Sequence, residues 1–365
     1  MNITILSLRG PTKSNIRGGA REYIQEISQG LIREGHKVRI ICGAEPKKDL
    51  YESEKVNGIE VIRVGKSKWS VFSIIKYYLK NLKNNTDILI ENIVSFPMYT
   101  SLFKGNKKHF TIVHHLTGKE YFKTQKLPIA VIGYFMENVT LRLMYRNSSF
   151  IAVSSYTKNA LINNGINERK IDIVNPGIRD DFFDPGEKSE KPEIFYVGRY
   201  SAFGGNKKVD HLIEAFKKVS EEVKEVKLIV AGKGDGIEVL KQQAKGYNVQ
   251  FVGMIDDELK RKYMQRAWLF ASPSLAEGFG ITWIEANACG TPVVGYKIEG
   301  LNTVDDSNSI MIEKGDITAL ANGVLKIISN NDLRKKLSNN ALKNSEKYNW
   351  SKSGEQFNKI ISRKL

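Results

Sequence analysis

Apolar residues along the chain follow two spacings, one typical of strands and one typical of helices. Residues 2–8 alternate and then run apolar, and residues 38–42 form a second apolar run. A helix is predicted between them, over 19–34, and Gly35 ends it. Its apolar positions recur at helical spacing and are Tyr23, Ile24, Ile27, Leu31 and Ile32. A strand, a helix and a strand in this order predict a parallel sheet covered by helices.

The same alternation continues through the rest of the chain in two series, separated by a stretch rich in proline, glycine and charge around 178–190. In the first series, further strands are predicted at 59–64, 88–91, 110–113 and 150–153. In the second series, the predicted strands are 194–197, 226–231, 249–252, 268–272 and 292–295. Its predicted helices are 209–219, 236–245, 256–267, 281–288, 317–329 and 332–347. The pattern therefore predicts an α/β protein made of two doubly wound domains.

The composition is that of a globular protein. Of the 365 residues, 41% are hydrophobic and 26% are charged, which excludes disorder, collagen and a disulfide scaffold. The two cysteines, Cys42 and Cys289, have apolar neighbours, so we expect buried free thiols in a reducing compartment. We find neither an apolar run of transmembrane length nor the basic start of a signal peptide, and we expect a cytoplasmic protein.

The net charge of +16 is spread unevenly along the chain. Residues 1–150 hold 24 Lys and Arg against 12 Asp and Glu, whereas residues 191–365 hold 27 against 21. A basic surface attracts nucleic acid, anionic lipid or a phosphorylated substrate, and charge alone does not choose among them.

Part of this charge lies in a predicted amphipathic helix over 66–83. Its apolar side consists of Trp69, Phe72, Ile75, Leu79 and Leu82. Its basic side consists of Lys76, Lys80 and Lys83. Together with residues 119–126, which add bases and aromatic rings, this helix predicts contact with an anionic membrane. The alternative is an ordinary helix that packs on the core and has one solvated face.

The strongest chemical signal is the segment Glu277-Gly278-Phe279-Gly280-Ile281-Thr282-Trp283-Ile284-Glu285. The predicted strand 268–272 leads into a loop with Glu277, two glycines follow, and a helix begins. The first amides of that helix can face an anion, and the glycines let the backbone approach a ligand closely. Glu285 lies eight residues after Glu277, which is about 12 Å of helical rise. Carboxylates at that separation can hold hydroxyls at two ends of one extended ligand, such as a sugar and a ribose.

This segment, with the following Ala286-Asn287-Ala288-Cys289-Gly290-Thr291-Pro292-Val293-Val294, resembles the retaining glycosyltransferases of family 4, also called group 1. That family carries two glutamates with seven residues between them in the same setting. Other stretches agree with the family in order, namely Gly18-Gly19, Gly35-His36-Lys37-Val38, Val197-Gly198-Arg199, Val230 to Gly234 and Val252-Gly253-Met254. The resemblance covers roughly residues 2–350.

The resemblance implies the GT-B fold, in which two Rossmann-like doubly wound domains face a central cleft. On this basis we expect an acceptor-binding domain over 1–178, a hinge over 179–192 and a nucleotide-sugar-binding domain over 193–347. A carboxy-terminal helix over 348–365 is expected to cross back to the first domain.

The resemblance also implies a clamp for the leaving diphosphate, made of Arg199 and Lys207. Fixed cations stabilise the charge that develops on a leaving group. The stretch between these two residues is about three residues longer than the family pattern, and this leaves Lys208 as the alternative to Lys207.

The remaining site residues take their roles from the same resemblance. Glu277 is expected to hold hydroxyls of the donor sugar, and Glu285 is expected to hold the ribose. His114, at the end of the strand 110–113, would orient sugar and acceptor, and His115 and Lys119 are candidates for contact with the acceptor. The catalytic set is Glu277, His114, Arg199 and Lys207. The donor-binding set is Gly18, Gly19, Gly198, Gly232, Lys233, Gly253, Met254, Gly278, Phe279, Gly280, Ile281 and Glu285.

The predicted activity is transfer of a hexose from a UDP- or GDP-sugar to a hydroxyl of a glycan, a lipid-linked saccharide or a lipid, with retained anomeric configuration. The resemblance implies front-face attack with the donor phosphate as base, and neither a metal nor another cofactor. The alternative is a catalytically silent protein that binds a nucleotide sugar or a glycan. The loop 232–236 lacks the spacing of a dinucleotide fingerprint, and we find no element that reads nucleic acid. We expect a cytoplasmic location, peripheral to the inner membrane face; the base, the sugar, the acceptor, the linkage and the oligomeric state stay open.

Overall fold

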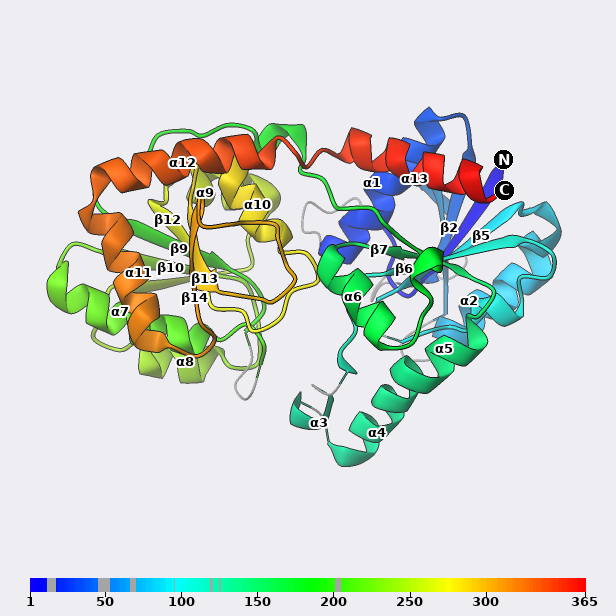
Figure 1. Ribbon diagram of the computed structural model, residues 1–365, viewed down its shortest axis with the longest axis horizontal. Coiled ribbons are helices and arrows are strands. Elements are labelled where there is room, and N and C mark those ends of the chain that lie inside the picture. Colours follow the sequence, from blue (N-terminus) through cyan, green and yellow to red (C-terminus); the bar gives the residue numbers. More distant parts are fainter. Residues whose placement is uncertain are drawn as a thin grey trace. The chain divides into compact units, whose positions relative to one another are not determined.

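The chain forms two compact units in the computed structural model (Figure 1). Unit 1 is Met1–Gly177 together with Trp350–Leu365, and unit 2 is Ile178–Asn349. The structure describes residues 1–11, 18–44, 53–65, 70–94, 96–118, 121–124, 126–200 and 205–365. These boundaries lie close to those expected at 178 and 347, and the carboxy-terminal helix belongs to unit 1.

Unit 1 is built on an eight-stranded sheet in the order β3-β4-β2-β1-β5-β6-β7-β8. The strands are β1 (Asn2–Ser7), β2 (Lys37–Gly43), β3 (Ser53–Val56), β4 (Ile59–Val64), β5 (Ile88–Ile93), β6 (Lys108–Val113), β7 (Ser149–Ala152) and β8 (Ile171–Ile173). All neighbours pair in parallel except β3 and β4. Helices cover both faces of a parallel sheet, so its central strands are buried on both faces. All six residues of β5 are buried, and four of them are apolar.

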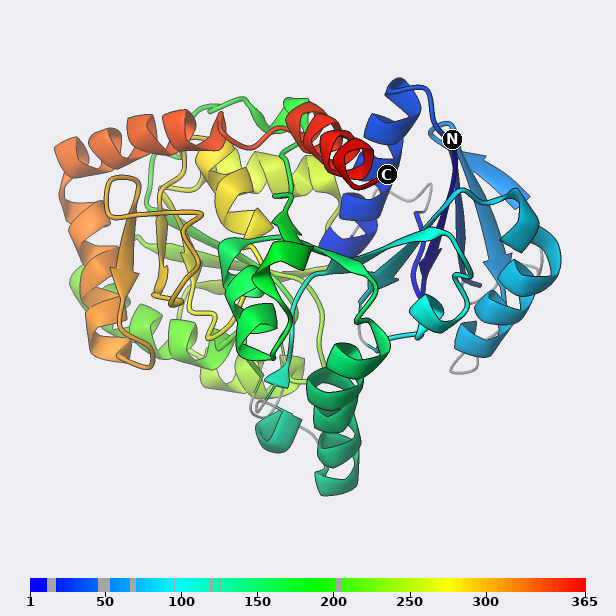
Figure 2. The same ribbon diagram turned by 45° about the vertical axis from the view of Figure 1, so that its right-hand side comes forward.

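The helices of unit 1 are α1 (Gly19–Arg33), α2 (Ser70–Tyr77), α3 (Tyr121–Thr124), α4 (Leu127–Phe135), α5 (Leu141–Met144), α6 (Ser155–Asn163) and α13 (Trp350–Lys364). Two π turns, η2 (Tyr78–Leu82) and η6 (Met136–Thr140), extend α2 and join α4 to α5, and short 3₁₀ turns are η3 (Lys83–Asn85), η4 (Thr100–Leu102) and η7 (Glu168–Lys170). The last helix, α13, lies against α1 (Figures 1 and 2). A Cβ on Gly30 of α1 would lie 2.6 Å from the Cα of Gly354 on α13, so the two backbones meet at a pair of glycines.

Unit 2 is built on a six-stranded parallel sheet in the order β11-β10-β9-β12-β13-β14. The strands are β9 (Glu193–Val197), β10 (Lys227–Ala231), β11 (Val249–Gly253), β12 (Leu269–Ser272), β13 (Val293–Tyr296) and β14 (Ser309–Ile312). Its helices are α7 (Val209–Glu222), α8 (Ile237–Gln243), α9 (Asp257–Arg266), α10 (Ile281–Ala288), α11 (Ile317–Ser329) and α12 (Asn331–Ser345), with a 3₁₀ turn η8 (Asp180–Phe182). The prediction of two doubly wound α/β units is confirmed.

The expected hinge, residues 179–192, packs along unit 2: Arg179 pairs with Asp257, and Ser189 contacts Arg266. One sequence prediction needs correction. The helix expected over 66–83 turns only part of its predicted apolar side outward. Its buried residue Ile74 lies on the unit 1 core.

Within α2 and η2, Ile75 and Leu82 also pack against that core, while Phe72 and Leu79 are exposed. The apolar positions are thus divided between the core and the surface. The prediction that they form one apolar side available to a membrane was wrong. Trp69 lies outside the described residues.

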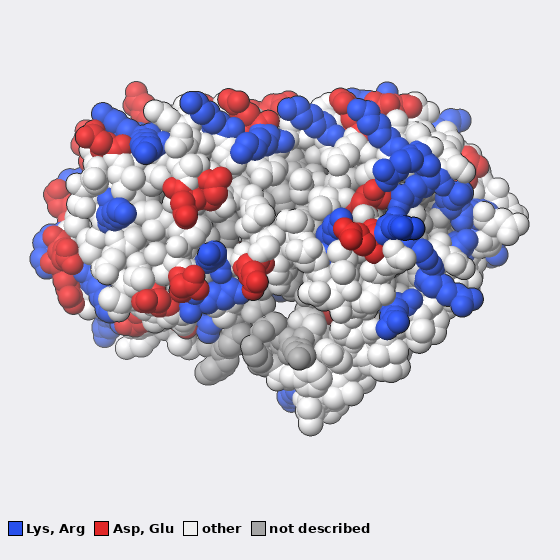
Figure 3. Space-filling view, in the orientation of Figure 1, with Lys and Arg blue, Asp and Glu red and all other residues white. Residues whose placement is uncertain are grey.

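The two units differ in charge. Unit 1 contains 31 Lys and Arg against 15 Asp and Glu, and unit 2 contains 25 of each. The whole net charge of +16 therefore belongs to unit 1. In Figure 3, red and blue side chains alternate over unit 2, and blue predominates over unit 1.

Candidate active site

The unit 2 candidates gather where its strand order reverses. β9 has β10 on one side and β12 on the other, and such a reversal opens a crevice at the carboxyl ends of the strands. Arg199 follows β9 and is exposed, and Glu277 lies in the loop after β12. The topology thus brings the predicted diphosphate-binding arginine and the predicted sugar-binding glutamate to one edge of one sheet.

Two of the predicted catalytic residues touch. Lys207 Nζ forms an ion pair with the carboxylate of Glu277, and both side chains are partly exposed. Their loops are joined by the backbone, because the Leu275 N–H donates to the Asn206 carbonyl at 2.7 Å. Lys208 instead caps α7 in the left-handed region, with φ of 44°. Of the two lysines that the sequence left open, Lys207 is the one paired with Glu277.

Three predicted donor-binding glycines close the ends of neighbouring strands. The Gly232 N–H donates to the Gly253 carbonyl at 2.7 Å. A Cβ on Gly232 would lie 1.8 Å from the Gly198 carbonyl oxygen, and the φ of Gly232 is 127°. The fold therefore requires glycine at Gly232 whether or not a ligand approaches. Lys233 and Met254, the neighbours of these glycines, are exposed.

The glycine-rich turn after Glu277 ends at the start of α10. Gly280 is the N-cap, with φ of 79°, and as a glycine it has no side chain with which to cap the first amides of the helix. The Trp283 indole N–H donates to the Ser272 hydroxyl at 2.9 Å and fixes the helix start on β12. Phe279 is buried edge-on against the Tyr348 ring, so its backbone rather than its side chain is available to a ligand.

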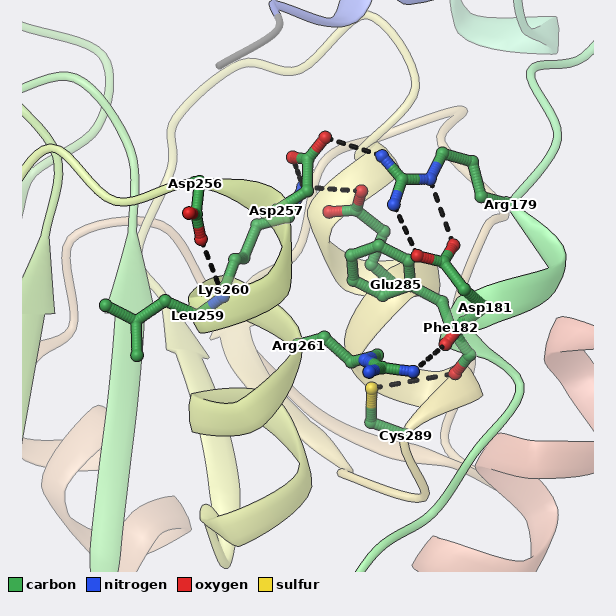
Figure 4. Close-up of polar contacts among 10 residues, drawn as sticks. All are labelled: Arg179, Asp181, Phe182, Asp256, Asp257, Leu259, Lys260, Arg261, Glu285 and Cys289. Carbon is green, nitrogen blue, oxygen red and sulfur yellow. Dashed lines mark hydrogen bonds and ion pairs between the residues drawn. The ribbon is translucent and has the colours of Figure 1, made fainter. Parts of the chain in front are cut away.

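Glu285, one turn and a half into α10, lies in a buried ionic network (Figure 4). It is 3% exposed, and Lys260 of α9 donates to its Oε1 at 2.7 Å. Lys260 also lies 3.2 Å from Asp257, which accepts from Arg179 at 2.6 Å. The aromatic ring of Phe182 lies under both cations.

This network leaves one oxygen of Glu285 unsatisfied. Burial raises the pKa of Glu285, and the charge of Lys260 opposes that rise. The second oxygen, Oε2, is buried and has no hydrogen-bond partner in the part of the chain that the structure describes. A buried acceptor without a donor costs free energy, so a ligand hydroxyl that reached Oε2 would gain a strong, charge-assisted bond.

In unit 1, His114 lies at the carboxyl end of β6 and is held by a chain of hydrogen bonds. Its Nε2–H donates to Asn92 Oδ1 at 2.7 Å, and Asn92 Nδ2 donates to the Ser7 hydroxyl at 2.9 Å. The edge of the Tyr23 ring packs on the imidazole, with 5.2 Å between ring centroids. Burial lowers the pKa of His114 to about 4, so the ring is neutral near pH 7 and Nδ1 is an acceptor.

The other unit 1 candidates have mixed settings. His115 stacks parallel to Tyr156 of α6, with 6.3 Å between ring centroids. Gly18 is the N-cap of α1 with φ of −108°, and a Cβ placed on it would meet no atom of the described residues within 4 Å. The described part of the fold therefore does not require glycine at Gly18. Gly19 begins α1, and Lys119 lies outside the described residues.

Several residues of the site were not found from the sequence. Lys260 is an ordinary helix lysine by its neighbours, and its partner Glu285 is 25 residues away. Asn92 had a usable signal, because Glu91 and Asn92 are two polar residues inside a strand whose other four residues are apolar. Among the described residues, no group of three or more His, Cys, Asp and Glu side chains is arranged as a metal site.

Two family models match the chain, one for each unit. The model described as Glycosyltransferase Family 4 matches residues 17–182, and the model described as Glycosyl transferases group 1 matches residues 177–344. The two matches meet where unit 1 passes into unit 2.

Relatives match over most of their length. An uncharacterized glycosyltransferase of Methanocaldococcus jannaschii is 26% identical over an alignment of 356 residues that covers 87% of this chain and 88% of the relative. The phosphatidyl-myo-inositol mannosyltransferase of Mycobacterium tuberculosis is 22% identical over an alignment of 357 residues that covers 89% of this chain and 88% of the relative. HepE of Anabaena, solved with UDP and glucose, has a TM-score of 0.77 at 18% identity, with all of both chains covered. This last likeness concerns the fold.

Proposed function

The chain belongs to family 4 of the glycosyltransferases, the group 1 transferases of GT-B fold, and we propose that it transfers a hexose from a nucleotide diphosphate sugar. The acceptor is a hydroxyl of a glycan, a lipid-linked saccharide or a lipid, and the anomeric configuration is retained. The observation that carries the proposal is the Lys207–Glu277 ion pair at the strand reversal of unit 2, with Glu285 on the helix that follows.

In this proposal, unit 2 binds the donor. Glu277 accepts hydrogen bonds from hydroxyls of the sugar, and the unsatisfied Oε2 of Glu285 accepts from a ribose hydroxyl. These two carboxylates meet only sugar and ribose hydroxyls in the proposal, so UDP- and GDP-sugars are both candidates. HepE, the structural neighbour solved with UDP and glucose, makes UDP-sugars the first donors to test.

Departure of the diphosphate is assisted by fixed positive charge. The bond between the anomeric carbon and the phosphate oxygen breaks, and its electron pair stays with the diphosphate. Arg199, Lys207 and the first amides of α10 stabilise that charge, and the amides at Gly18 and Gly19 add to them. These cations do the work that a divalent metal does in other transferases, so we propose transfer without a metal.

The acceptor oxygen attacks the same face from which the diphosphate leaves, and its proton passes to a phosphate oxygen. This route needs no nucleophile from the protein. Neutral His114 accepts a hydrogen bond from a sugar hydroxyl through Nδ1, because its Nε2–H is bound to Asn92. We propose a cytoplasmic location, in keeping with two buried free cysteines.

A nucleotide panel tests the donor site. The melting temperature of the full chain is measured with UDP, GDP, ADP and TDP, each at about 100 times its expected Kd, where a specific ligand adds about 2.7 kcal/mol of stability. A shift with one nucleotide supports the proposal, and no shift with any of them overturns it.

Turnover separates a transferase from a silent binding protein. The matching nucleotide sugar is incubated with candidate lipid and glycan acceptors, and release of the nucleotide diphosphate is followed. The proposal expects release by the wild type and loss of release in Glu277→Gln and Arg199→Ala. Nucleotide binding without release from any donor and acceptor pair would favour the silent binding protein.

A further inference from the structure

One helix of unit 1 exposes apolar side chains along its whole length. It runs from Leu127 to Met144 through α4, η6 and α5, and we call it the α4–α5 helix. Its exposed apolar residues are Leu127, Ile129, Val131, Ile132, Phe135, Val139, Leu143 and Met144, with exposed fractions between 38% and 69%. Only 22% of the helix is buried, although its length and composition would suit a membrane span. Figures 1 and 2 show it projecting from the sheet of unit 1.

The side of this helix that faces the protein is narrow and contains the only acid of the helix. Ala130, Gly133, Glu137 and Leu141 are buried at helical spacing. Glu137 accepts hydrogen bonds from the Gly118 N–H at 2.8 Å and from the Tyr121 hydroxyl at 3.0 Å. A surface helix of a water-soluble domain usually turns its apolar stripe inward. Here the acid is inside, and most of the large apolar residues are outside.

Cations lie at both ends of the exposed apolar face. Lys126 precedes the helix, and Arg142 and Arg146 lie on its last turn and just beyond it; all three are exposed. A surface hollow of about 430 Å³ is lined by Asn147, the residue after Arg146, and by four lysines: Lys104, Lys107, Lys108 and Lys364. Unit 1 as a whole carries +16, whereas unit 2 is neutral.

We propose that the α4–α5 helix docks unit 1 on an anionic lipid bilayer. The helix lies in the plane of the headgroups with its apolar side chains in the upper acyl region, and the surrounding lysines and arginines contact lipid phosphates. An anionic bilayer matches both the exposed apolar face of the helix and the cations around it, because it offers apolar acyl chains and negatively charged headgroups together. A second copy of this chain matches only the apolar half, since a symmetric pair would place the same cations against each other.

The position of the helix in the chain connects docking with the site. β6 ends at Val113, His114 follows it, and Gly118, four residues further on, donates a hydrogen bond to Glu137 of the α4–α5 helix. Docking would hold the His114 end of the unit 1 sheet at the membrane surface. The docking stands without the transfer activity; only its use in presenting a lipid-borne acceptor rests on the proposed function.

Vesicle sedimentation of the full chain tests the proposal. Vesicles of phosphatidylcholine alone are compared with vesicles of phosphatidylcholine and phosphatidylglycerol. We expect binding to the anionic vesicles, weakened by salt, and a decrease of about tenfold or more in the double variant Ile132→Asp/Phe135→Asp. Val239→Asp, on α8 of unit 2, is the matched control, because Val239 is 54% exposed and lies outside the docking surface. Phe72→Asp is the second control: Phe72 is exposed on α2, so this variant tests whether α2 contributes to vesicle binding.

Each result decides the proposal. Binding that is lost in the double variant and kept in both single controls, with melting temperatures equal to that of the wild type, supports it. No binding to anionic vesicles, or equal binding by the double variant, overturns it. Loss in Phe72→Asp alone would assign docking to α2 and overturn the α4–α5 assignment. A concentration-dependent dimer that the double variant abolishes, without vesicle binding, would show that a second copy covers the helix.

Discussion

Units 1 and 2 follow the same doubly wound plan, yet unit 1 carries all of the net charge and exposes an apolar helix, while unit 2 has equal numbers of acids and bases. In unit 2, charges meet each other: Lys207 pairs with Glu277, and Lys260 with Glu285. In unit 1, Lys126, Arg142 and Arg146 face outward around an apolar surface. In unit 2, oppositely charged residues therefore pair within the candidate site. In unit 1, exposed cations border a surface that can bind an external partner.

The comparison also shows that the two proposed functions, donor binding and membrane docking, use different parts of the same kind of fold. The strand reversal between β9 and β12 places Arg199 and Glu277 after two neighbouring strands of one sheet, and Lys207 pairs with Glu277. The docking surface needs no strand-end loop, because it is the outer face of a helix that follows β6. Variants in one unit should leave the other task intact, and the predictions below use this separation.

The largest effect is expected from Lys260→Met. The substitution leaves the Glu285 carboxylate buried without its counter-ion, and breaking a buried pair costs about 3–5 kcal/mol. Because burial already raises the pKa of Glu285, the folded state binds its proton more readily than the unfolded state does. The loss of stability should therefore be smaller near the acid end of the stable range than at neutral pH, since protonation removes the buried charge. Urea unfolding at two pH values measures both quantities.

Lys262→Met is the matched control on the same helix. Lys262 pairs with Glu258 at the surface, four residues away, and such pairs contribute about 0.3–0.5 kcal/mol. Equal losses in the two variants would contradict the account of the Glu285 network.

Glu277→Gln should lower the transfer rate by about 10–100-fold, because a charged hydrogen bond to the sugar is replaced by a neutral one. The melting temperature should change little, since Glu277 is not fully buried. Steady-state kinetics with the donor identified by the nucleotide panel give the rate. Glu238→Gln, an exposed acid on α8, serves as the control and should keep the wild-type rate. If Glu277→Gln kept the wild-type rate, Glu277 would have no role in transfer, and the proposed site would be contradicted at its central residue.

Gly30→Ala should destabilise unit 1 by about 1–3 kcal/mol, because the new methyl group would meet the α13 backbone at Gly354. Gly18→Ala has room for its methyl group among the described residues and an ordinary φ, so it should cost only the small stability difference between glycine and alanine at an N-cap, and it should lower transfer. Thermal unfolding of the two variants makes the comparison. A stability loss in Gly18→Ala as large as in Gly30→Ala would show that Gly18 serves the fold.

The smallest effect is expected from the titration of His114. Because burial lowers its pKa to about 4, its ring should stay neutral and contribute no step to the rate between about pH 6 and 8. The unfolded chain binds this proton more readily, so stability should fall as the pH drops through the range between the unfolded and folded pKa values. Titration of the ring signals by NMR checks the pKa directly. A step in those signals near pH 6.5 would contradict the buried, Asn92-bound ring.

The sequence predicted most strands and the main helices, because buried parallel strands are apolar and their covering helices are periodic. It missed β3, β8 and β14, which are short and lie at or near sheet edges, where burial on both faces is not required. Glu277 and Arg199 could be found because each follows a strand in a recognisable glycine setting. Lys260 could not, since its pairing with Glu285 exists only once α9 and α10 pack together.

The α4–α5 helix shows a different limit of sequence reading. A helical pattern places acids outward and apolar residues inward, but the contacts of Glu137 with Gly118 and Tyr121 reverse that orientation. Those partners lie 16 and 19 residues away, so no local pattern contains them. The membrane prediction from the sequence therefore named residues 66–83 and not residues 127–144.

The division of tasks between the units is tested most directly by two binding titrations on the same three proteins: the wild type, Arg199→Ala and Ile132→Asp/Phe135→Asp. Each is titrated with the nucleoside diphosphate that the panel selects and with anionic vesicles. The account predicts that Arg199→Ala loses about tenfold in nucleotide affinity and keeps vesicle binding, while the double variant does the reverse. The account would be contradicted if either variant lost both nucleotide binding and vesicle binding, or if both variants kept both kinds of binding.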